Sequence, residues 1–363
     1  MNPRQGIAEV ARHFQFQGDI SAIEPHGNGH INDTWCVTCR VDTDAARYIL
    51  QRINRNVFRD PAAVMQNIER VTTHLAAQAA DESDCVCRAL TLIPAEDGRS
   101  WHVDADGDTW RAYLFINNAH SFEAATSPVQ AFQAARAFGR FQHQLASLPP
   151  PRLNETIPNF HHTPKRFAVL QKAVAADICN RAALAKPEID FAFARQSITN
   201  ILLDADLPER IAHNDTKLNN VLFDNESGNA VCVIDLDTVM PGLALYDFGD
   251  MVRTITSPAE EDEQDLSKVT MQMSFFESLL RGYHQAAGRL LTLAEKQHLV
   301  AAAKVITFEQ GIRFLADYLA GDAYYKVHRE GHNLHRCRTQ FKLVESMERQ
   351  EEAMNLLVES IVC

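Results

Sequence analysis

The stretch Ile211-Ala212-His213-Asn214-Asp215-Thr216-Lys217-Leu218-Asn219-Asn220 decides how the rest of the chain is interpreted. A short apolar strand at residues 221–223 follows it directly, and a turn at residues 225–229 leads back into a second strand. The second strand ends in Ile234-Asp235-Leu236-Asp237. A polar loop followed by a tight hairpin brings polar side chains from both of its ends to one place. The pattern therefore predicts a site at this hairpin.

Three of these side chains suit the transfer of a phosphoryl group to a hydroxyl group. Such a transfer needs a carboxylate near the attacking hydroxyl and oxygen ligands that hold magnesium on the phosphates. Asp215 can meet the hydroxyl, Asn220 can bring an amide oxygen to the metal, and Asp235 can supply the metal carboxylate. The alternative interpretation is a polar turn with Asx hydrogen bonds and a solvated aspartate. The strand pair with an aspartate at its end favours the catalytic interpretation.

On the N-terminal side of the loop, the chain is rich in short strand patterns separated by turns. Strands are predicted at residues 20–24, 33–41, 47–53, 85–93, 100–103 and 110–116. Residues 61–77, between the third and fourth strands, carry apolar side chains at helical spacing. A sheet of about five strands with one inserted helix favours antiparallel order.

The remainder of the chain is predicted to be mainly helical. Helices are expected at residues 128–145, 163–185, 186–203 and 268–287. The sequence Thr292-Leu293-Ala294-Glu295 has the form of a capping box that opens a further, long helix, which Gly321 could end. The fold class is therefore α+β, with a small antiparallel β lobe that contains one helix, followed by a larger helical lobe.

Composition limits the classes of protein and partner. The 363 residues carry 47 acidic and 35 basic side chains, a net charge of -12. Nucleic-acid binders normally present a basic face, so this balance speaks against a nucleic-acid partner. No apolar run approaches the roughly 20 residues that cross a bilayer, and the N-terminal residues do not resemble a signal peptide. We expect a cytoplasmic monomer without a membrane partner.

For two other sequence patterns, a structural role is favoured over a metal-binding or catalytic role. Cys36 and Cys39 have CxxC spacing, but residues three apart on a strand point to opposite faces, so a metal-thiolate site is disfavoured. The eight cysteines fit reduced thiols in a chain of this length. The acidic run at residues 260–265 indicates a solvated loop.

The loop at 211–220 resembles the catalytic and metal-binding loops of the protein-kinase-like phosphotransferases, which include aminoglycoside phosphotransferases and choline kinases. Within that family, further segments are similar to the N-acetylhexosamine 1-kinases. These segments are residues 27–32, 47–51, 234–242, 311–318 and 332–334. The resemblance implies a two-lobed, protein-kinase-like fold. A nucleotide-binding lobe would occupy residues 1–113, and residues 114–363 would hold the hinge, the catalytic loop and the substrate site.

The resemblance also implies an activity, which is ATP- and Mg²⁺-dependent phosphorylation of the anomeric C1 hydroxyl of N-acetylglucosamine or N-acetylgalactosamine. Asp215 would orient and deprotonate that hydroxyl, which is more acidic than other sugar hydroxyls. Asn220 and Asp235 would bind Mg²⁺. Lys217 would lie on the γ-phosphate; its alternative is an exposed loop lysine. Asp237 is either a second metal ligand or a fold contact.

In the helical lobe, Arg313 is expected to grip the sugar hydroxyls or the N-acetyl group, with Tyr324 as a weaker companion. The alternative for Arg313 is a solvated ion-pair ladder with Glu309 and Asp317, because these residues recur every fourth position on one helix. Two aspartates that follow the hairpin, Asp247 and Asp250, are expected to fix the catalytic loop by hydrogen bonds. His161 and His162 show no metal partner and are expected at the entry to a helix.

In the β lobe, the turn Gly27-Asn28-Gly29 would lie over the phosphates, and His30 would reach the sugar. Taken alone, this turn predicts an ordinary hairpin. The segment 113–116, which begins at Tyr113, would be the hinge whose backbone groups meet adenine.

The third strand departs from the wider family, which usually has a lysine there. This chain offers Gln51 or Arg52 at that point. Either residue would bind the phosphates or pair with Glu69 on the inserted helix.

Two alternatives remain open at this point. The first is the same fold acting on another small hydroxyl compound, such as an aminoglycoside, choline or homoserine; an amino-cation acceptor needs several carboxylates that converge on the site. The second is a nucleotide-binding regulatory module without turnover, suggested by the missing third-strand lysine. The presence of Asp215, Asn220 and Asp235 argues against the second alternative.

Overall fold

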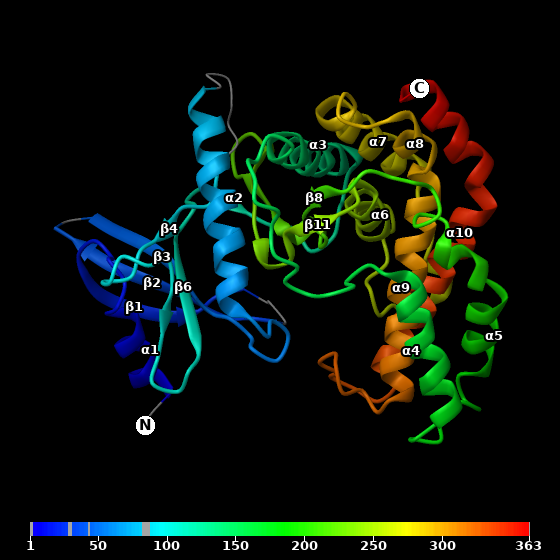
Figure 1. Ribbon diagram of the computed structural model, residues 1–363, viewed down its shortest axis with the longest axis horizontal. Helices are drawn as coiled ribbons and strands as arrows, with labels where there is room; N and C mark the ends of the chain where they lie inside the picture. Colours follow the sequence, from blue (N-terminus) through cyan, green and yellow to red (C-terminus); the bar gives the residue numbers. More distant parts are fainter. Residues whose placement is uncertain (1–2, 28–30, 43, 82–87, 363) are drawn as a thin grey trace. The chain divides into compact units, whose positions relative to one another are not determined.

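The computed structural model describes residues 3–27, 31–42, 44–81 and 88–362, and the chain forms two compact units (Figure 1). The first unit comprises Met1–Ala119, Leu148–Pro158 and Ile234–Met240. The second unit comprises His120–Ser147, Asn159–Val233 and Pro241–Cys363. The functional division into residues 1–113 and 114–363 stays a prediction, because compactness alone does not show which unit binds nucleotide or substrate.

An antiparallel sheet is the centre of the first unit. Within the described ranges it has six strands in the order β1-β2-β3-β6-β4, and β5 pairs with β6. The strands are β1 (Asp19–Pro25), β2 (Asp33–Val41), β3 (Asp44–Arg52), β4 (Leu92–Ile93), β5 (His102–Val103) and β6 (Thr109–Leu114). The predicted antiparallel order is confirmed. The strand expected at 85–93 is reduced to β4, and residues 82–87 lie outside the described residues.

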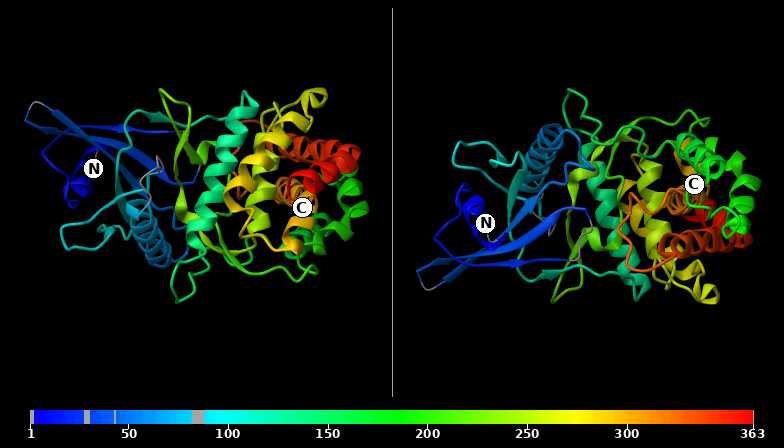
Figure 2. Two further views of the ribbon diagram at one scale, coloured as in Figure 1. Left: turned by 90° about the horizontal axis from the view of Figure 1, so that it is seen from above. Right: turned by 90° about the horizontal axis from the view of Figure 1, so that it is seen from below.

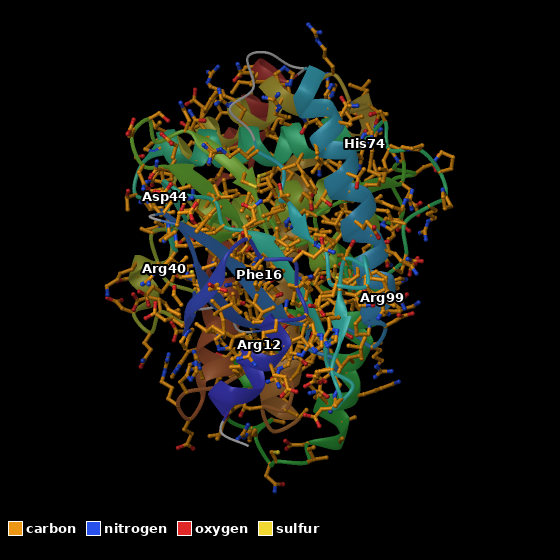
Figure 3. The ribbon with its side chains drawn as sticks, turned by 90° about the vertical axis from the view of Figure 1, so that its left-hand side faces the viewer. Arg12, Phe16, Arg40, Asp44, His74 and Arg99 are labelled. Carbon is orange, nitrogen blue, oxygen red and sulfur yellow. The ribbon has the colours of Figure 1, made fainter. Side chains whose placement is uncertain are left out.

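Two helices accompany the sheet, α1 (Pro3–Ala11) and α2 (Pro61–Asp81), and α2 confirms the inserted helix. Alternate side chains of β2, β3 and β6 point into one apolar core, to which the end of α1 contributes Val10 and Ala11. The ribbon shows α1 beside the strands of the sheet (Figures 1 and 2). This alternation is the period-two pattern from which the strands were predicted. Figure 3 looks onto this unit and labels Arg12 and Phe16 just after α1, and Arg40 and Asp44 at the hairpin between β2 and β3.

Helices dominate the second unit. They are α3 (Pro128–Leu145), α4 (Thr163–Ala176), α5 (Lys186–Ala194), α6 (Ala244–Ile255), α7 (Met273–Ala287), α8 (Leu293–Gln297), α9 (Leu299–Leu319) and α10 (His332–Ile361). α9 contributes much of the shared apolar core, and α10 packs along it (Figure 1). α3 and α7 approach closely. Gly282 of α7 lies so near the backbone of Phe132 on α3 that a Cβ atom at Gly282 would overlap the carbonyl oxygen of Phe132. α3 has the bounds that the sequence predicted.

Short strands and single turns frame the catalytic stretch. The strands are β7 (Ala119–His120), β8 (Arg210–Ala212), β9 (Val221–Asp224), β10 (Ala230–Val233) and β11 (Met240–Gly242). The 3₁₀ turns are η1 (Gln196–Asn200), η2 (Leu218–Asn220), η3 (Leu236–Thr238) and η4 (Leu266–Lys268). β9 and β10 form the predicted antiparallel hairpin. The loop from residue 213 to 217 therefore runs between β8 and η2, and the hairpin follows it.

Two predicted helices are too long, because a local turn ends the first one early and a tertiary contact ends the second. The helix expected at 163–185 stops at Ala176, since Asp177 takes a left-handed conformation (φ 37°) and its carboxylate accepts from the amides of Arg181 and Ala182. The helix expected at 186–203 stops at Ala194. There Arg195 leaves the helix to pair with Glu348 on α10 at 2.9 Å.

The other two long predictions are also corrected. The capping box at Thr292 is confirmed, but α8 ends after five residues. The ring of His298 donates to the carbonyl oxygen of Ala294 at 2.7 Å and occupies the acceptor that a continuous helix would use, so α9 begins anew. The helix expected at 268–287 begins only at Met273, because the amide of Gln272 donates to Thr256 instead. No helix of the described ranges combines the length and apolar character needed to cross a membrane.

Candidate active site

The loop after β8 is held by one fully buried carboxylate on α6. Asp247 accepts hydrogen bonds from the backbone amides of His213 at 2.9 Å and Asn214 at 2.7 Å. The carbonyl oxygen of Asp247 accepts from the hydroxyl of Thr216 at 2.7 Å. Burial raises the pKa of Asp247 above its ordinary value, although the surrounding donors act in the opposite direction. Asp247 thus has the loop-fixing role that was expected for it.

A second buried carboxylate reaches the same loop through a histidine. Glu309 on α9 lies 2.8 Å from Nδ1 of His161, and Nε2 of His161 lies 3.1 Å from the carbonyl oxygen of Asn214. Carboxylate and carbonyl oxygens only accept, so the ring satisfies both contacts only when both of its nitrogens are protonated. Burial would raise the pKa of Glu309, but His161, Arg313 and Thr163 lower it below its ordinary value. His161 therefore anchors the loop, beyond its expected place at a helix entry.

Asp215 lies between two polar neighbours on its own loop. Nζ of Lys217 is 3.1 Å from Oδ2 of Asp215, and Nδ2 of Asn220 donates to the same oxygen at 3.1 Å. About a quarter of the Asp215 side chain is exposed (26%). Burial would raise its pKa, but the charges of Lys217, His213 and Arg253 hold it below the ordinary value. Asp215 is therefore ionised at neutral pH and able to accept a hydrogen bond from a hydroxyl.

Arg253, on α6, contributes a positive charge that the sequence motif did not reveal. Its guanidinium bonds to Asp250 at 2.8 Å and to Glu261 at 3.3 Å. Asp250, which was expected to fix the loop, therefore holds Arg253, and Arg253 in turn lowers the pKa of Asp215. The i, i+3 spacing of Asp250 and Arg253 was the available signal.

The acidic run at 260–265 lies in a loop, as predicted, and Glu260, Glu261 and Asp265 are exposed. Two of its carboxylates also form ion pairs that the sequence did not reveal. Glu261 pairs with Arg253 and with Arg336, and Asp262 pairs with Arg329 and His332.

Arg313, on α9, lies among aromatic rings. Its guanidinium carbon is 5.1 Å from the centroid of Phe160 and 5.9 Å from that of Tyr325, and Nη1 donates to Gln310. Among the described residues Arg313 has no ion pair, and Glu309 is nearly fully buried, so the solvated ladder is excluded. Tyr324 stands beside Tyr325 and is 53% exposed.

A second arginine shares this region. Arg166, on α4, donates twice to the carbonyl oxygen of Phe160, at 3.0 and 2.9 Å. Burial lowers the pKa of Arg166, and the charge of Arg313 lowers it further. The two guanidinium groups are thus close enough to repel each other. Sequence reasoning missed Arg166, since nothing in the spacing of α4 links it to Arg313.

Asp235 and Asp237 belong to the first unit and differ sharply in environment. Asp235 is exposed and takes a left-handed conformation (φ 60°). Asp237 is buried and forms a bidentate ion pair with Arg111 of β6. Asp237 is therefore a fold contact, whereas Asp235 is accessible to solvent. The place of Asp235 beside Asn220 at a metal ion stays a prediction.

The two third-strand candidates are both engaged within the first unit. Gln51 donates to Thr34 at 3.1 Å and accepts from Arg111 at 3.0 Å. Arg52 pairs with Asp33 at 2.5 Å and with Asp108 at 3.2 Å. Their phosphate-binding role stays a prediction.

On α2, Glu69 is exposed, and the buried Asn67 makes the contacts of this helix instead. Asn67 donates to the carbonyl oxygens of Asn154 and Val239 at 2.8 and 3.0 Å. In the sequence, only the position of Asn67 beside the apolar stripe of α2 indicated that this residue makes contacts.

The other nucleotide-binding candidates that the structure describes lie just after β1 and in β6. Gly27 has φ 74° with open space where a Cβ would be, whereas Asn28, Gly29 and His30 lie outside the described residues. Tyr113 is buried in β6 with no hydrogen-bond partner for its hydroxyl, and burial raises its pKa. The amides of residues 114 and 115 donate to Thr91 and Arg47. The adenine-binding role of residues 113–116 stays a prediction.

Comparisons with known proteins agree with this geometry. Residues 22–293 match the sequence profile described as the phosphotransferase enzyme family. Over 97% of this chain and 99% of that one, the fold matches a microcompartment-associated aminopropanol kinase (17% identity, TM-score 0.58). An aminoglycoside phosphotransferase from Alicyclobacillus acidocaldarius matches over 97% and 96% (13% identity, TM-score 0.61). A spectinomycin phosphotransferase in complex with ADP and spectinomycin matches over 96% and 98% (12% identity, TM-score 0.58). At such identities the likeness shows a shared protein-kinase-like fold.

Proposed function

The chain belongs to the phosphotransferase enzyme family, and we propose that it transfers the γ-phosphate of ATP to the anomeric C1 hydroxyl of an N-acetylhexosamine, with Mg²⁺ as cofactor. The family supports phosphoryl transfer to a small molecule. The ADP bound to the similar spectinomycin phosphotransferase supports a nucleotide donor. The sugar acceptor is the finer part of the proposal, and it depends on the charges near Asp215.

Positive charge in the second unit is the observation that carries the acceptor class. Arg253 lowers the pKa of Asp215, and it also acts on Arg313, which in turn acts on Arg166. The charge of Arg253 is compensated by Asp250 and Glu261, whereas Arg313 has no ion pair among the described residues. Arg313 would therefore repel the positive charge of an aminoglycoside or choline. A neutral sugar offers hydroxyl and acetamide oxygens that accept hydrogen bonds from guanidinium groups. The described charges therefore favour a neutral sugar over an amine.

Asp215 and Lys217 carry the reaction in this proposal. The ionised Asp215 accepts the hydrogen bond of the C1 hydroxyl and takes its proton as the new oxygen–phosphorus bond forms and the bond to the ADP oxygen breaks. Lys217, 40% exposed and 3.1 Å from Asp215, keeps that carboxylate ionised and offers its ammonium to the transferred phosphate. Asp247 and His161 hold the loop, which reduces the motion needed to align the reacting atoms.

Asn220 and Asp235 fit the requirements of Mg²⁺, which binds oxygen ligands and is commonly held by one or two carboxylates plus phosphates. The amide nitrogen of Asn220 is used by Asp215, so its amide oxygen is the atom left for a metal. The carboxylate of Asp235 is exposed. When bound, the ion would neutralise charge on the phosphates.

The alternative of a regulatory module without turnover rests on the missing third-strand lysine. Three features weigh against it: the ionised state of Asp215, the two buried anchors of its loop, and the free amide oxygen of Asn220. A module that only bound nucleotide would not need a preformed base.

ADP release with Mg²⁺-ATP tests the proposal across N-acetylglucosamine, N-acetylgalactosamine, galactose, choline, homoserine and kanamycin. We expect turnover with the N-acetylhexosamines, and ³¹P NMR of the product should place the phosphate on C1. Turnover only with an amine would keep the phosphotransferase and overturn the sugar. Silence with all six, while ATP still binds, would favour the regulatory module.

A further inference from the structure

A buried ion pair ties β6 to the segment that follows β10. Both terminal nitrogens of the Arg111 guanidinium face the two carboxylate oxygens of Asp237, with 3.0 Å between Nη2 and Oδ2. Both side chains are nearly fully buried (1% and 3% exposed). A bidentate pair fixes orientation as well as distance. The position of Asp237 is therefore set by β6.

The pair has further hydrogen-bond partners on neighbouring segments. Asn32 donates to Oδ2 of Asp237, and the hydroxyl of Thr156 donates to the carbonyl oxygen of Asp237 at 2.9 Å. Nε of Arg111 donates at 3.0 Å to Gln51, one of the two residues that this chain offers where the family usually has a lysine. Because both side chains are nearly fully buried, neither charged group of the pair is exposed to a nucleotide or a metal ion.

Two residues before Asp237, Asp235 is exposed, and its charge acts on the buried Arg111. Asp235 has φ 60°, a left-handed conformation that aspartate and asparagine adopt more readily than most other residues with a side chain. Its neighbour Leu236 is buried, and the next fixed point is the carbonyl oxygen of Val239, which accepts from Asn67 of α2 at 3.0 Å. The chain on the C-terminal side of Asp235 is thus fixed at two residues, Asp237 and Val239.

We propose that Arg111 and Asp237 are positioning residues for the metal ligand Asp235. The pair imposes the turn that presents the Asp235 carboxylate, and so sets the affinity for the metal without touching it. This inference rests on the proposed role of Asp235 in holding Mg²⁺. The third strand has no lysine, but a fixed cation lies next to this strand, because Arg111 on β6 is opposite Gln51.

The test needs variants that fold. Removing one partner of a buried ion pair leaves an uncompensated charge, whereas replacing both by apolar side chains of similar size is often tolerated. The double variant R111M/D237L therefore keeps a packed interior without the ion pair. R111K is a second, milder change, since lysine keeps the charge but loses the planar bidentate fork.

The readout is equilibrium binding of Mn²⁺ in the presence of ADP, followed by the electron paramagnetic resonance signal of free Mn²⁺. Acceptor KM and the melting temperature are measured beside it. We expect both variants to raise the Mn²⁺ dissociation constant by about 10- to 100-fold, as changes behind a metal ligand commonly do, with acceptor KM within about twofold. D235N should weaken Mn²⁺ binding at least as much.

A matched control is the exposed ion pair of Arg99 and Asp97 in the same unit, 2.6 Å apart (Arg99 is labelled in Figure 3). The variant R99M/D97L should bind Mn²⁺ like the wild type. If a folded R111M/D237L or R111K bound Mn²⁺ within about twofold of the wild type while D235N did not, the inference would be wrong and the proposed function would stand. If D235N also bound Mn²⁺ normally, the metal role of Asp235 would fail, and the inference with it. A rise in acceptor KM equal to the loss of Mn²⁺ affinity would indicate general loosening and overturn the positioning role.

Discussion

The side-chain amide nitrogen of Asn220 donates both to the backbone oxygen of Asp215, at 2.8 Å, and to its carboxylate, at 3.1 Å. One side chain therefore fixes the orientation of the candidate base and keeps its own amide oxygen available. Because η2 places Asn220 directly before β9, the hairpin and the base are built as one unit. The predictions below follow from this arrangement and from the charges around it.

Replacement of Asp215 by Asn should abolish the base with little change in shape. The amide cannot take the hydroxyl proton, so we expect kcat to fall by about 10²- to 10⁴-fold, with the KM of the acceptor changed only slightly. Steady-state ADP release measures both constants. A D215N enzyme that kept the wild-type kcat would remove Asp215 from the reaction.

Replacement of Lys217 by Met should shift the pH dependence. The pKa of Asp215 lies below its ordinary value because Lys217 and its neighbours outweigh the effect of burial. Activity that needs the ionised form is complete above that pKa and is lost as the pH falls through it. Without Lys217 the pKa rises, so the acid limb of kcat/KM should move to higher pH.

Rates measured at several pH values, with wild type and K217M in parallel, check this shift. Lys268, another exposed lysine paired with a carboxylate of the second unit, supplies the control variant K268M. Its acid limb should coincide with that of the wild type. An unshifted limb in K217M would show that Lys217 does not act on Asp215.

Replacement of Asp247 by Asn should destabilise the loop. An amide oxygen can accept from only one side, and its NH₂ group would face another backbone donor at His213 or Asn214. An unsatisfied buried donor costs about 1–3 kcal/mol, so the free energy of unfolding should fall by that amount. Urea unfolding measures the loss. A D247N protein as stable as the wild type would contradict the anchoring role.

Replacement of Arg313 by Met should weaken binding of the acceptor alone. Loss of a charged hydrogen-bond donor should raise acceptor KM by about tenfold or more and leave the KM of ATP unchanged. The matched control is R195M, because the guanidinium of Arg195 also stacks on an aromatic ring, Phe191, at 3.7 Å but pairs with Glu348. Equal effects of R313M and R195M would assign Arg313 to packing instead of the acceptor site.

Local sequence patterns were sufficient to predict those elements of the fold that depend on the spacing of apolar residues. The alternation of apolar residues predicted the antiparallel sheet, and the spacing of apolar residues predicted α3 and α2. Helix ends were less predictable, since the side chain of His298 and the left-handed Asp177 end helices through contacts that spacing does not show. α6 and α10 were not predicted. The buried side of α10 carries polar residues, among them Gln340 and Ser346, which weakens an apolar pattern.

The residues of the candidate site likewise divide into those that the sequence identified and those that it missed. Asp215 and Asn220 were identified because their roles depend on close spacing in one loop. Arg111 was missed because its importance depends on the register that sets Gln51 opposite Arg111 and on a partner 126 residues away. Arg166 was missed because nothing in the spacing of α4 links it to Arg313. The anchoring role of His161 was missed because its partners, Glu309 and Asn214, lie far away in the sequence. Arg253 was missed although its i, i+3 spacing from Asp250 was visible in the sequence.

The most direct test of the central claim is ADP release with N-acetylglucosamine and with its 1-deoxy and 6-deoxy analogues. Transfer to the anomeric hydroxyl by Asp215 predicts turnover with the parent sugar and the 6-deoxy analogue. It also predicts that the 1-deoxy analogue binds as a competitive inhibitor without releasing ADP. ADP release with the 1-deoxy analogue, at a rate near that of the parent sugar, would contradict the claim.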